Sequence, residues 1–164
     1  MKKLLISAGA LAALALSTPA FAAASNTAQA SASVNIVSPL TLTKNSDLDF
    51  GTVVGPFSGT AVEISNAGTP NCGTLTCSGS PSAANFTVSG GTANQALAVT
   101  VDPSVSMTSG GNTLVADLTT DLPGAVSTDA SGGATFGVGG KLTLAAGTVD
   151  GLYSGTFNVT VNYQ

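Results

Sequence analysis

Acidic side chains are the main candidates for chemistry in this chain, because its sequence holds eight carboxylates and no histidine. Without histidine, no Ser-His-Asp triad, Cys-His pair or zinc site can be assembled. Asp47 and Asp49 lie two residues apart and would share one face of a strand, as the paired acids of a glycosidase could. Exposed carboxylates are far commoner than catalytic ones, and the single glutamate, Glu63, lies in a strand pattern. We therefore expect no enzymatic activity and no catalytic residue.

Two further patterns resemble ligand sites only in part. Asp117, Asp121 and Asp150 could offer oxygen ligands to Ca²⁺, but they lie in no calcium-loop signature. Gly139-Gly140-Lys141 resembles a phosphate-binding loop, yet the glycine and the hydroxyl residue required at its two ends are missing. Like the other glycine pairs of the chain, Gly139-Gly140 is interpreted as a hairpin turn. We expect no metal and no cofactor.

The N-terminus predicts export from the cytoplasm. Two lysines precede an apolar run from Leu4 to Leu16, and the small-residue triplet Ala20-Phe21-Ala22 follows, which is typical of a secretory signal cleaved after Ala22. The run is shorter than the roughly 20 apolar residues of a membrane span, and no cysteine stands at the cleavage point for a lipid anchor. We expect residues 1–22 to be a signal peptide, and the mature protein to pass through the periplasm to the cell surface or to be secreted.

Composition bounds the mature protein. Removing 22 of the 164 residues leaves 142, a size suited to one domain with a hydrophobic core. The two remaining lysines, Lys44 and Lys141, oppose all eight acids, so the net charge is −6. Such a charge argues against nucleic acid or an anionic membrane as a partner. Charged residues make up only 7% of the chain, so Ser, Thr and Asn must keep it soluble, which suits a structural surface protein.

Cys72 and Cys77 are the only cysteines. In an exported protein an even pair is most simply a disulfide, which we expect here. The loop that it closes is so short that chain entropy predicts only about 2 kcal/mol of stabilisation. The bridge would therefore fix a local loop rather than join two sheets.

Short alternating runs, separated by glycine and proline turns, fill the mature chain, and no helical period occurs after the signal. Nine or ten strands at this spacing predict an all-β fold, an antiparallel immunoglobulin-like β-sandwich. The runs are 28–37, 40–43, 47–54, 60–65, 85–89, 95–102, 113–119, 134–138, 141–145 and 151–164. The expected core is Leu40, Leu42, Leu48, Phe50, Val62, Ile64, Phe86, Val88, Leu97, Val99, Val101, Leu114, Leu118, Phe136, Val138, Leu142 and Leu144.

The C-terminal segment has the clearest strand pattern. From Thr156 to Gln164, polar and apolar residues alternate without exception, as in a half-buried strand. A slip of one residue would bury the polar side chains, so the register is well specified. Because no residue follows Gln164, we expect at least one neighbour of this strand to come from earlier in the chain or from another chain. Its face carries Gly151, Tyr153, Phe157, Val159, Val161 and Tyr163.

A matching alternation occurs near the start of the mature chain. One face of this segment consists of Ala28, Ala30, Ala32, Val34 and Ile36. In one interpretation the segment is the first strand of its own domain and pairs with the C-terminal strand of the same molecule. In the other, it leaves its domain and completes the sheet of a neighbouring copy. Alternation alone does not separate the two interpretations.

Four motifs carry a resemblance to a known family: Val34-Asn35-Ile36, Leu48-Asp49-Phe50-Gly51, Gly151 to Phe157, and Val159 to Tyr163. They resemble secreted bacterial proteins grouped as a domain of unknown function. These are similar to chaperone-usher pilins, including the archaic spore-coat-U-like group and the common-pilus major subunits. The most specific part is the end, where a glycine fourteen residues from the terminus, counted from Gly151 to Gln164, precedes the alternating strand and its penultimate tyrosine.

The resemblance implies an incomplete immunoglobulin-like fold that lacks its last strand and has a hydrophobic groove beside the C-terminal strand. The C-terminal apolar face, Gly151 to Tyr163, would be the polymerisation acceptor edge. A periplasmic chaperone would fill the groove first and hold the carboxylate of Gln164. At an outer-membrane usher, the N-terminal extension of the next copy, residues 23–37, would replace the chaperone as a donor strand, with Ala28 to Ile36 as donor residues.

We therefore expect a structural subunit of a cell-surface pilus, or fimbria, that polymerises by donor-strand exchange and supports adhesion or biofilm, with residues 38–164 as its pilin-like domain. The expected partners are other copies, a chaperone and an usher, with no nucleic acid and no membrane anchor. The alternative is a self-complemented, monomeric secreted sandwich that binds a surface glycan or protein. The scarcity of aromatic residues, 5% of the chain with no tryptophan, counts against stacking on sugars.

Overall fold

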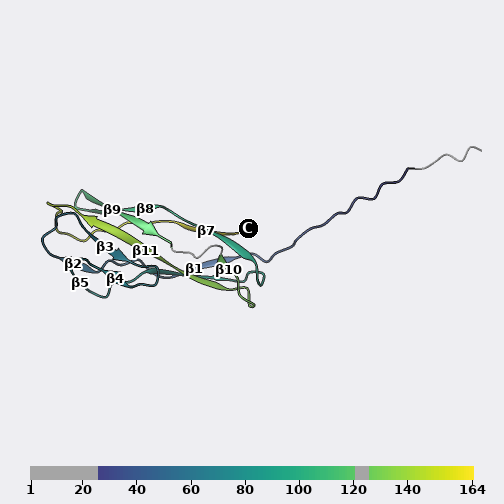
Figure 1. Cartoon of the computed structure of the whole chain (residues 1–164), viewed down its shortest axis with the longest axis horizontal. Coiled ribbons are helices and arrows are strands. Elements are labelled where there is room, and N and C mark those ends of the chain that lie inside the picture. The colour runs from purple at the N-terminus through teal and green to yellow at the C-terminus, as the bar shows by residue number, and fades with distance from the viewer. Residues whose placement is uncertain (1–25, 121–125) are drawn as a thin grey trace, which may run out of the picture. The chain divides into compact units, whose positions relative to one another are not determined.

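The computed structural model describes residues 26–120 and 126–164, and all regular structure in these ranges is β-strand, which confirms the expected all-β fold (Figure 1). None of these residues belongs to a helix that could cross a membrane. The strands are β1 (Thr41–Ser46), β2 (Thr52–Val54), β3 (Thr60–Ile64), β4 (Pro70–Asn71), β5 (Thr76–Ser78), β6 (Ala84–Ser89), β7 (Ala96–Val101), β8 (Ser104–Ser109), β9 (Asn112–Thr119), β10 (Val126–Ser127), β11 (Ala134–Leu144) and β12 (Val159–Tyr163).

Strand β11 pairs with three other strands, and every strand pair is antiparallel. Its first half pairs with β6, and its second half pairs with both β3 and β9. The resulting seven-stranded sheet has the order β1-β6-β11-β3-β4, with β9 joined to β11 and β8 to β9. Strands β10, β7 and β12 form a three-stranded sheet, and β2 and β5 form a two-stranded one. Figure 1 shows β11 as one long strand.

Glycine allows β11 to change partners along its length. The sequence predicts a hairpin turn at Gly139-Gly140, but this is wrong, since both glycines lie inside β11. A Cβ on Gly139 would overlap the carbonyl oxygen of Ile64, so the chain leaving β3 approaches β11 too closely for any side chain. By contrast, Gly110 and Gly111 have positive φ angles, 53° and 86°, and do form the predicted hairpin turn, between β8 and β9.

The strands differ from the predicted runs in several places: β4, β5, β8 and β10 were not predicted, and only residues 52–54 of the predicted strand 47–54 form a strand, β2. The predicted strand at 28–37 does not form, and residues 26–40 contain no strand at all. An extended segment without a partner has no acceptor for its backbone N–H groups, so alternation alone cannot stabilise it. The C-terminal strand begins at Val159 rather than Gly151. Strand β8 was not predicted, because its apolar residues, Val105 and Met107, are isolated among serine and threonine.

Apolar side chains from these sheets pack into two clusters. The second cluster contains Phe86 and Phe136, which lie opposite each other in the β6–β11 ladder and stack with ring centroids 5.5 Å apart. Leu48, Leu118 and Phe157 contact both clusters and so join them. The first cluster is Phe50, Val62, Ile64, Leu75, Ala83, Val105, Ala116, Leu142 and Leu144, and the second is Ala84, Phe86, Val88, Leu97, Phe136 and Val138.

Replacing Gly139 by alanine tests the close approach of β3 and β11. We expect Gly139→Ala to lower the free energy of unfolding by about 2–3 kcal/mol, because the new Cβ must push the Ile64 carbonyl away. The matched control is Gly133→Ala, where a Cβ would meet nothing closer than 3.5 Å. Denaturant unfolding measures both variants, and equal losses would contradict the role given to Gly139.

Candidate functional site

Strands β1 and β12 each leave one backbone edge unpaired. Within the described residues, β1 has β6 as its sole strand partner and β12 has β7. Such an edge presents N–H and C=O groups that can pair with a further strand. Both edges border the second cluster, because Leu40, Leu42, Val159, Val161 and Tyr163 all pack against it. We call these five residues the open border.

The side chains of the open border are half-buried rather than buried. Along β12, Val159, Val161 and Tyr163 are half-buried, while the residues between them are exposed. Apolar area therefore remains that a further strand could remove from water, at about 25 cal/mol per Å². Several other residues predicted for the core are also only half-buried, namely Leu48, Val99, Val101, Leu114 and Leu118.

Tyr163 closes one end of the open border. Its hydroxyl donates to the carbonyl oxygen of Ser38 at 2.7 Å and accepts from the amide of Thr92 at 2.8 Å. The amide of Ser38 donates to Thr92 Oγ1, also at 2.8 Å. A Cβ on Gly91 would lie 2.7 Å from Leu40 Cδ2 and 3.0 Å from the Tyr163 hydroxyl oxygen. This closed end is thus filled by side chains of its own domain, and Ser38, Gly91 and Thr92 had no signal in the sequence beyond a predicted turn.

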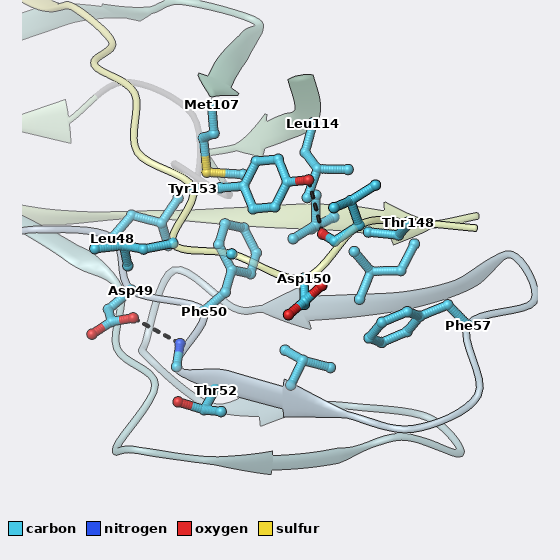
Figure 2. A pocket seen from close by; sticks show the side chains of 17 residues that line it. Leu48, Asp49, Phe50, Thr52, Phe57, Met107, Leu114, Thr148, Asp150 and Tyr153 are labelled. Atoms are coloured by element: carbon cyan, nitrogen blue, oxygen red, sulfur yellow. Dashed lines mark hydrogen bonds between the residues drawn. The ribbon is translucent and has the colours of Figure 1, made fainter. Parts of the chain in front are cut away.

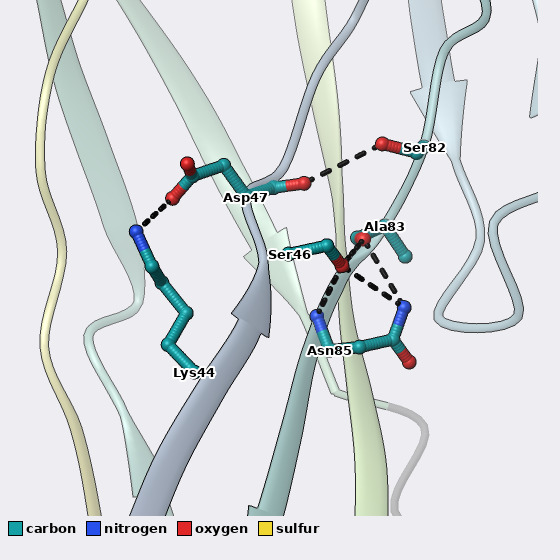
Figure 3. Close-up of polar contacts among 6 residues, drawn as sticks. All are labelled: Lys44, Ser46, Asp47, Ser82, Ala83 and Asn85. Atoms are coloured by element: carbon teal, nitrogen blue, oxygen red, sulfur yellow. Dashed lines mark hydrogen bonds and ion pairs between the residues drawn. The ribbon is translucent and has the colours of Figure 1, made fainter.

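A bulge fixes the far end of β1. The β1–β6 register shifts between Lys44 and Ser46. There the Ser46 hydroxyl accepts from the amide of Asn85 and donates to the carbonyl oxygen of Ala83, both at 3.1 Å (Figure 3). Because a side chain replaces the backbone ladder at this point, β1 ends and the chain continues to Leu48.

The segment that precedes β12 continues along β7 and β8. The amide of Asn158 donates to Asp102 Oδ2 at 2.8 Å. Ser154 and Thr108 exchange two backbone hydrogen bonds, at 2.9 and 3.2 Å. Phe157 lies between these anchor points and contacts both clusters. Residues 154–163 therefore follow one course, with the closed end at Tyr163.

A pocket of about 450 Å³ lies at the other end of this course (Figure 2). Gly151 to Tyr153 and the chain from Leu48 to Val53 both contribute to it. Val149 and Leu152, also in its lining, are exposed by 48% and 88%. The rest of the lining is mainly apolar and includes Phe50, Phe57, Met107, Leu114, Leu142 and Leu144.

The polar groups of the pocket are acidic or neutral. Asp49 and Asp150 lie in the lining, and no lysine or arginine is among the described residues there. The Asp49 carboxylate accepts from the amide of Gly51 at 2.7 Å, and the Tyr153 hydroxyl donates to the carbonyl oxygen of Val149 at 2.9 Å. With its acceptor groups and apolar walls, the pocket is suited to hold an uncharged or cationic apolar group and not an anion.

The other acids do not come together as a metal site. Asp47 forms an exposed ion pair with Lys44, so it and Asp49 have different partners. No three acidic, cysteine or histidine side chains gather among residues 26–120 and 126–164. Asp121 lies outside the described residues.

The remaining predicted residues belong to the disulfide, the N-terminal segment and the signal peptide. Cys72 and Cys77 form the expected disulfide, which is confirmed. The segment from residue 26 to residue 36 is exposed throughout, with Val34 at 82% and Ile36 at 83%. The predicted signal peptide and its cleavage site at Ala22 lie outside the described residues.

A tight loop supports the closed end. Asp129 Oδ1 accepts from the amide and hydroxyl of Ser131 and from the amide of Gly133, at 2.7–2.9 Å. The hydroxyl of Ser131, first, and then the two amides hold the pKa of Asp129 below its usual value of 3.8. The loop presents the carbonyl oxygen of Gly132 to the amide of Gly91, at 3.1 Å. By holding this loop, the Asp129 carboxylate indirectly stabilises Gly91, which lies beside Tyr163.

The fold and the site define an antiparallel all-β protein with open edges at β1 and β12, among others, and an apolar pocket. The chain belongs to the family described as Domain of unknown function (DUF4402), whose sequence profile matches residues 40–163. That match runs from the residue before β1 to the last residue of β12, so it includes both β1 and β12. No curated protein and no solved structure matches the chain.

The variant Tyr163→Phe tests the closed end. It leaves the Ser38 carbonyl and the Thr92 amide without their shared partner, so we expect a loss of about 1–2 kcal/mol in the free energy of unfolding and faster hydrogen exchange at the Thr92 amide. Tyr153→Phe is the matched control, because it removes a single exposed hydrogen bond and should cost a few tenths of that. Equal costs would refute a special role for Tyr163.

Acid should weaken the Asp129 loop. Because the folded pKa is lowered, the contribution of this carboxylate is present above about pH 4 and is lost as the pH falls through the folded value. The difference in stability between the native protein and Asp129→Asn should therefore shrink on acidification. Ser131→Ala should raise the pKa of Asp129 in a carboxyl NMR titration, and an unchanged titration would contradict the assignment.

Proposed function

We propose that the protein is a pilus subunit with an incomplete immunoglobulin-like β-sandwich fold, polymerised by donor-strand exchange at the bacterial cell surface. In this proposal the N-terminal segment of one copy, residues 23–37, adds a strand beside β12 of the next copy. The observation that carries the proposal is the unpaired edge of β12 above the half-buried side chains of the open border.

The N-terminal segment has the chemistry that such an edge requires. Residues 26–38 contain no charged residue, so adding them as a strand would bury no charge. Their backbone would pair with the free N–H and C=O groups of β12, while alternate side chains would cover the open border. The apolar face of the segment is fully available for this contact, because residues 26–36 are exposed.

An exposed border must be covered before polymerisation, because free edges and apolar surface promote aggregation. A periplasmic chaperone would supply a temporary strand, and an outer-membrane usher would exchange it for the segment of the next copy. Basic residues on the chaperone would bind the carboxylate of Gln164. The excess of acidic residues over lysines in the mature chain favours such a basic partner.

The proposal predicts a ladder of oligomers on a denaturing gel when the samples are not boiled. Deleting residues 23–37 should abolish the ladder, and so should the single change Ile36→Asp, because it would bury a charge against apolar side chains. Asn35→Asp is the matched control, since it adds the same charge on the opposite face of the strand and should keep the ladder.

A soluble monomer that shows no ladder with its full N-terminal segment, and loses stability when the segment is removed, would refute polymerisation. That result would favour the self-complemented monomeric sandwich instead.

A further inference from the structure

We propose that the pocket at Tyr153 binds the quaternary ammonium group of a small organic cation. The pocket combines the three components that such a group requires, namely apolar walls, aromatic rings and carboxylates without basic side chains among them. All of these residues come from a single copy of the chain. The site is therefore independent of the proposed strand exchange and exists whether or not the protein polymerises.

Three aromatic rings line the pocket. Phe50 precedes β2, Phe57 lies between β2 and β3, and Tyr153 precedes β12. Figure 2 shows these rings in the lining together with Met107. The π-electrons of aromatic rings attract a cation electrostatically, and this is the usual way in which proteins recognise a quaternary ammonium. The volume of about 450 Å³ is in the range of small-molecule sites, so a trimethylammonium group with a short chain fits.

The pocket carries negative charge that no basic side chain of its lining balances. Asp49 and Asp150 both belong to the lining. Neither of the described lysines does, and Lys44 forms its ion pair with Asp47 instead. Within residues 26–120 and 126–164, the Asp150 carboxylate has no hydrogen-bond or ion-pair partner, so both of its oxygens are available to a cation. Asp150 is therefore the main counter-charge for the ligand.

The loop that carries Asp150 is held on both sides of this residue. Before it, the amide and the hydroxyl of Thr148 donate to the carbonyl oxygen of Ala145, at 3.2 and 2.8 Å. After it, the Tyr153 hydroxyl donates to the carbonyl oxygen of Val149 at 2.9 Å, which closes a turn around Asp150. The carboxylate and the tyrosine ring are thus positioned before a ligand binds, and a preformed site keeps the entropic cost of binding small.

Hydration distinguishes a quaternary ammonium from other ligands. Asp49 and Asp150 would repel an anion, and an uncharged ligand would leave their charge unbalanced. A primary ammonium or a guanidinium carries N–H donors, which would lose their hydrogen bonds to water against a mainly apolar lining. A trimethylammonium group has no N–H donor. It therefore brings positive charge to the two carboxylates at the lowest cost of desolvation.

Saturation-transfer NMR tests the proposal, because it detects weak ligands of monomers and filaments alike. The probes are choline, neohexyl alcohol, in which a carbon atom replaces the nitrogen, and the tert-butylacetate anion, each added to the full chain. We expect choline to bind roughly fivefold more tightly than the alcohol, and the anion not to bind. Equal affinities of choline and the alcohol, or no binding of choline, would refute the proposal.

This outcome is separable from that of the proposed function. A ladder of oligomers without choline binding refutes the ammonium site alone. Choline binding to a chain that forms no ladder refutes strand exchange alone.

Single substitutions locate the site. Asp150→Asn should weaken choline binding roughly fivefold, because it removes the charge and keeps the shape of the side chain. The matched control is Asp117→Asn, which removes the same charge from an exposed position of β9 outside the pocket and should leave the affinity unchanged. Tyr153→Leu should weaken binding more than Tyr153→Phe, since phenylalanine keeps an aromatic ring. Equal losses in the two aspartate variants would indicate general attraction to an acidic protein and would refute the site.

Two sources offer this chemistry, a free small molecule and the headgroup of a lipid. Phosphocholine distinguishes them, because it carries a phosphate beside the same ammonium. We expect phosphocholine to bind less tightly than choline, since Asp49 and Asp150 repel the phosphate. That result assigns the site to a free ammonium compound, whose carbon chain would cover the exposed side chains of Val149 and Leu152. Equal or tighter binding of phosphocholine would overturn this assignment in favour of a lipid headgroup.

Discussion

Backbone hydrogen bonding at the edge of β12 is the constraint on which the rest of the structure depends. A strand in a sheet can satisfy its N–H and C=O groups on two sides, and β12 has strand β7 on one side alone among the described residues. Its apolar face points into the second cluster, yet nothing beyond it completes the burial of Val159 and Val161. The sheet and the core are thus left open at the same place, and one additional strand would satisfy both.

Strand β11 organises the larger sheet. Its glycines admit β3 at backbone contact, so a single long strand holds β3, β6 and β9. Within residues 26–120 and 126–164, the strands at the ends of the two largest sheets, including β1 and β12, have no further strand neighbour. Local packing makes the two ends of the opening unequal: Gly91 and Tyr163 fill one end, whereas loop residues 148–153 leave a pocket at the other. The two ends of residues 153–163 therefore differ because of the side chains around them.

Alternation predicted the elements that are stabilised by burial of one face, such as β12, whose half-buried residues are those expected. Alternation and turn composition failed where backbone contacts determine whether a segment forms a strand. Gly139-Gly140 has the composition of a turn, but tertiary packing against Ile64 requires glycine within a strand. The segment 28–37 has the pattern of a strand without a partner to pair with. The pocket combines residues from β2, β8, β9, β11 and the loop before β12, so no local signal in the sequence could predict it.

The composition of the N-terminal segment limits the apolar area that it exposes. Residues 26–36 are exposed, and an alternating run of Val and Ile over the full length of an exposed segment would be an aggregation-prone strand. Alanine reduces the exposed apolar area at three positions, Ala28, Ala30 and Ala32. Large apolar side chains are confined to Val34 and Ile36, which are exposed by 82% and 83%. Under the proposed strand exchange, these two residues would gain the most from burial, because each carries more apolar area than alanine.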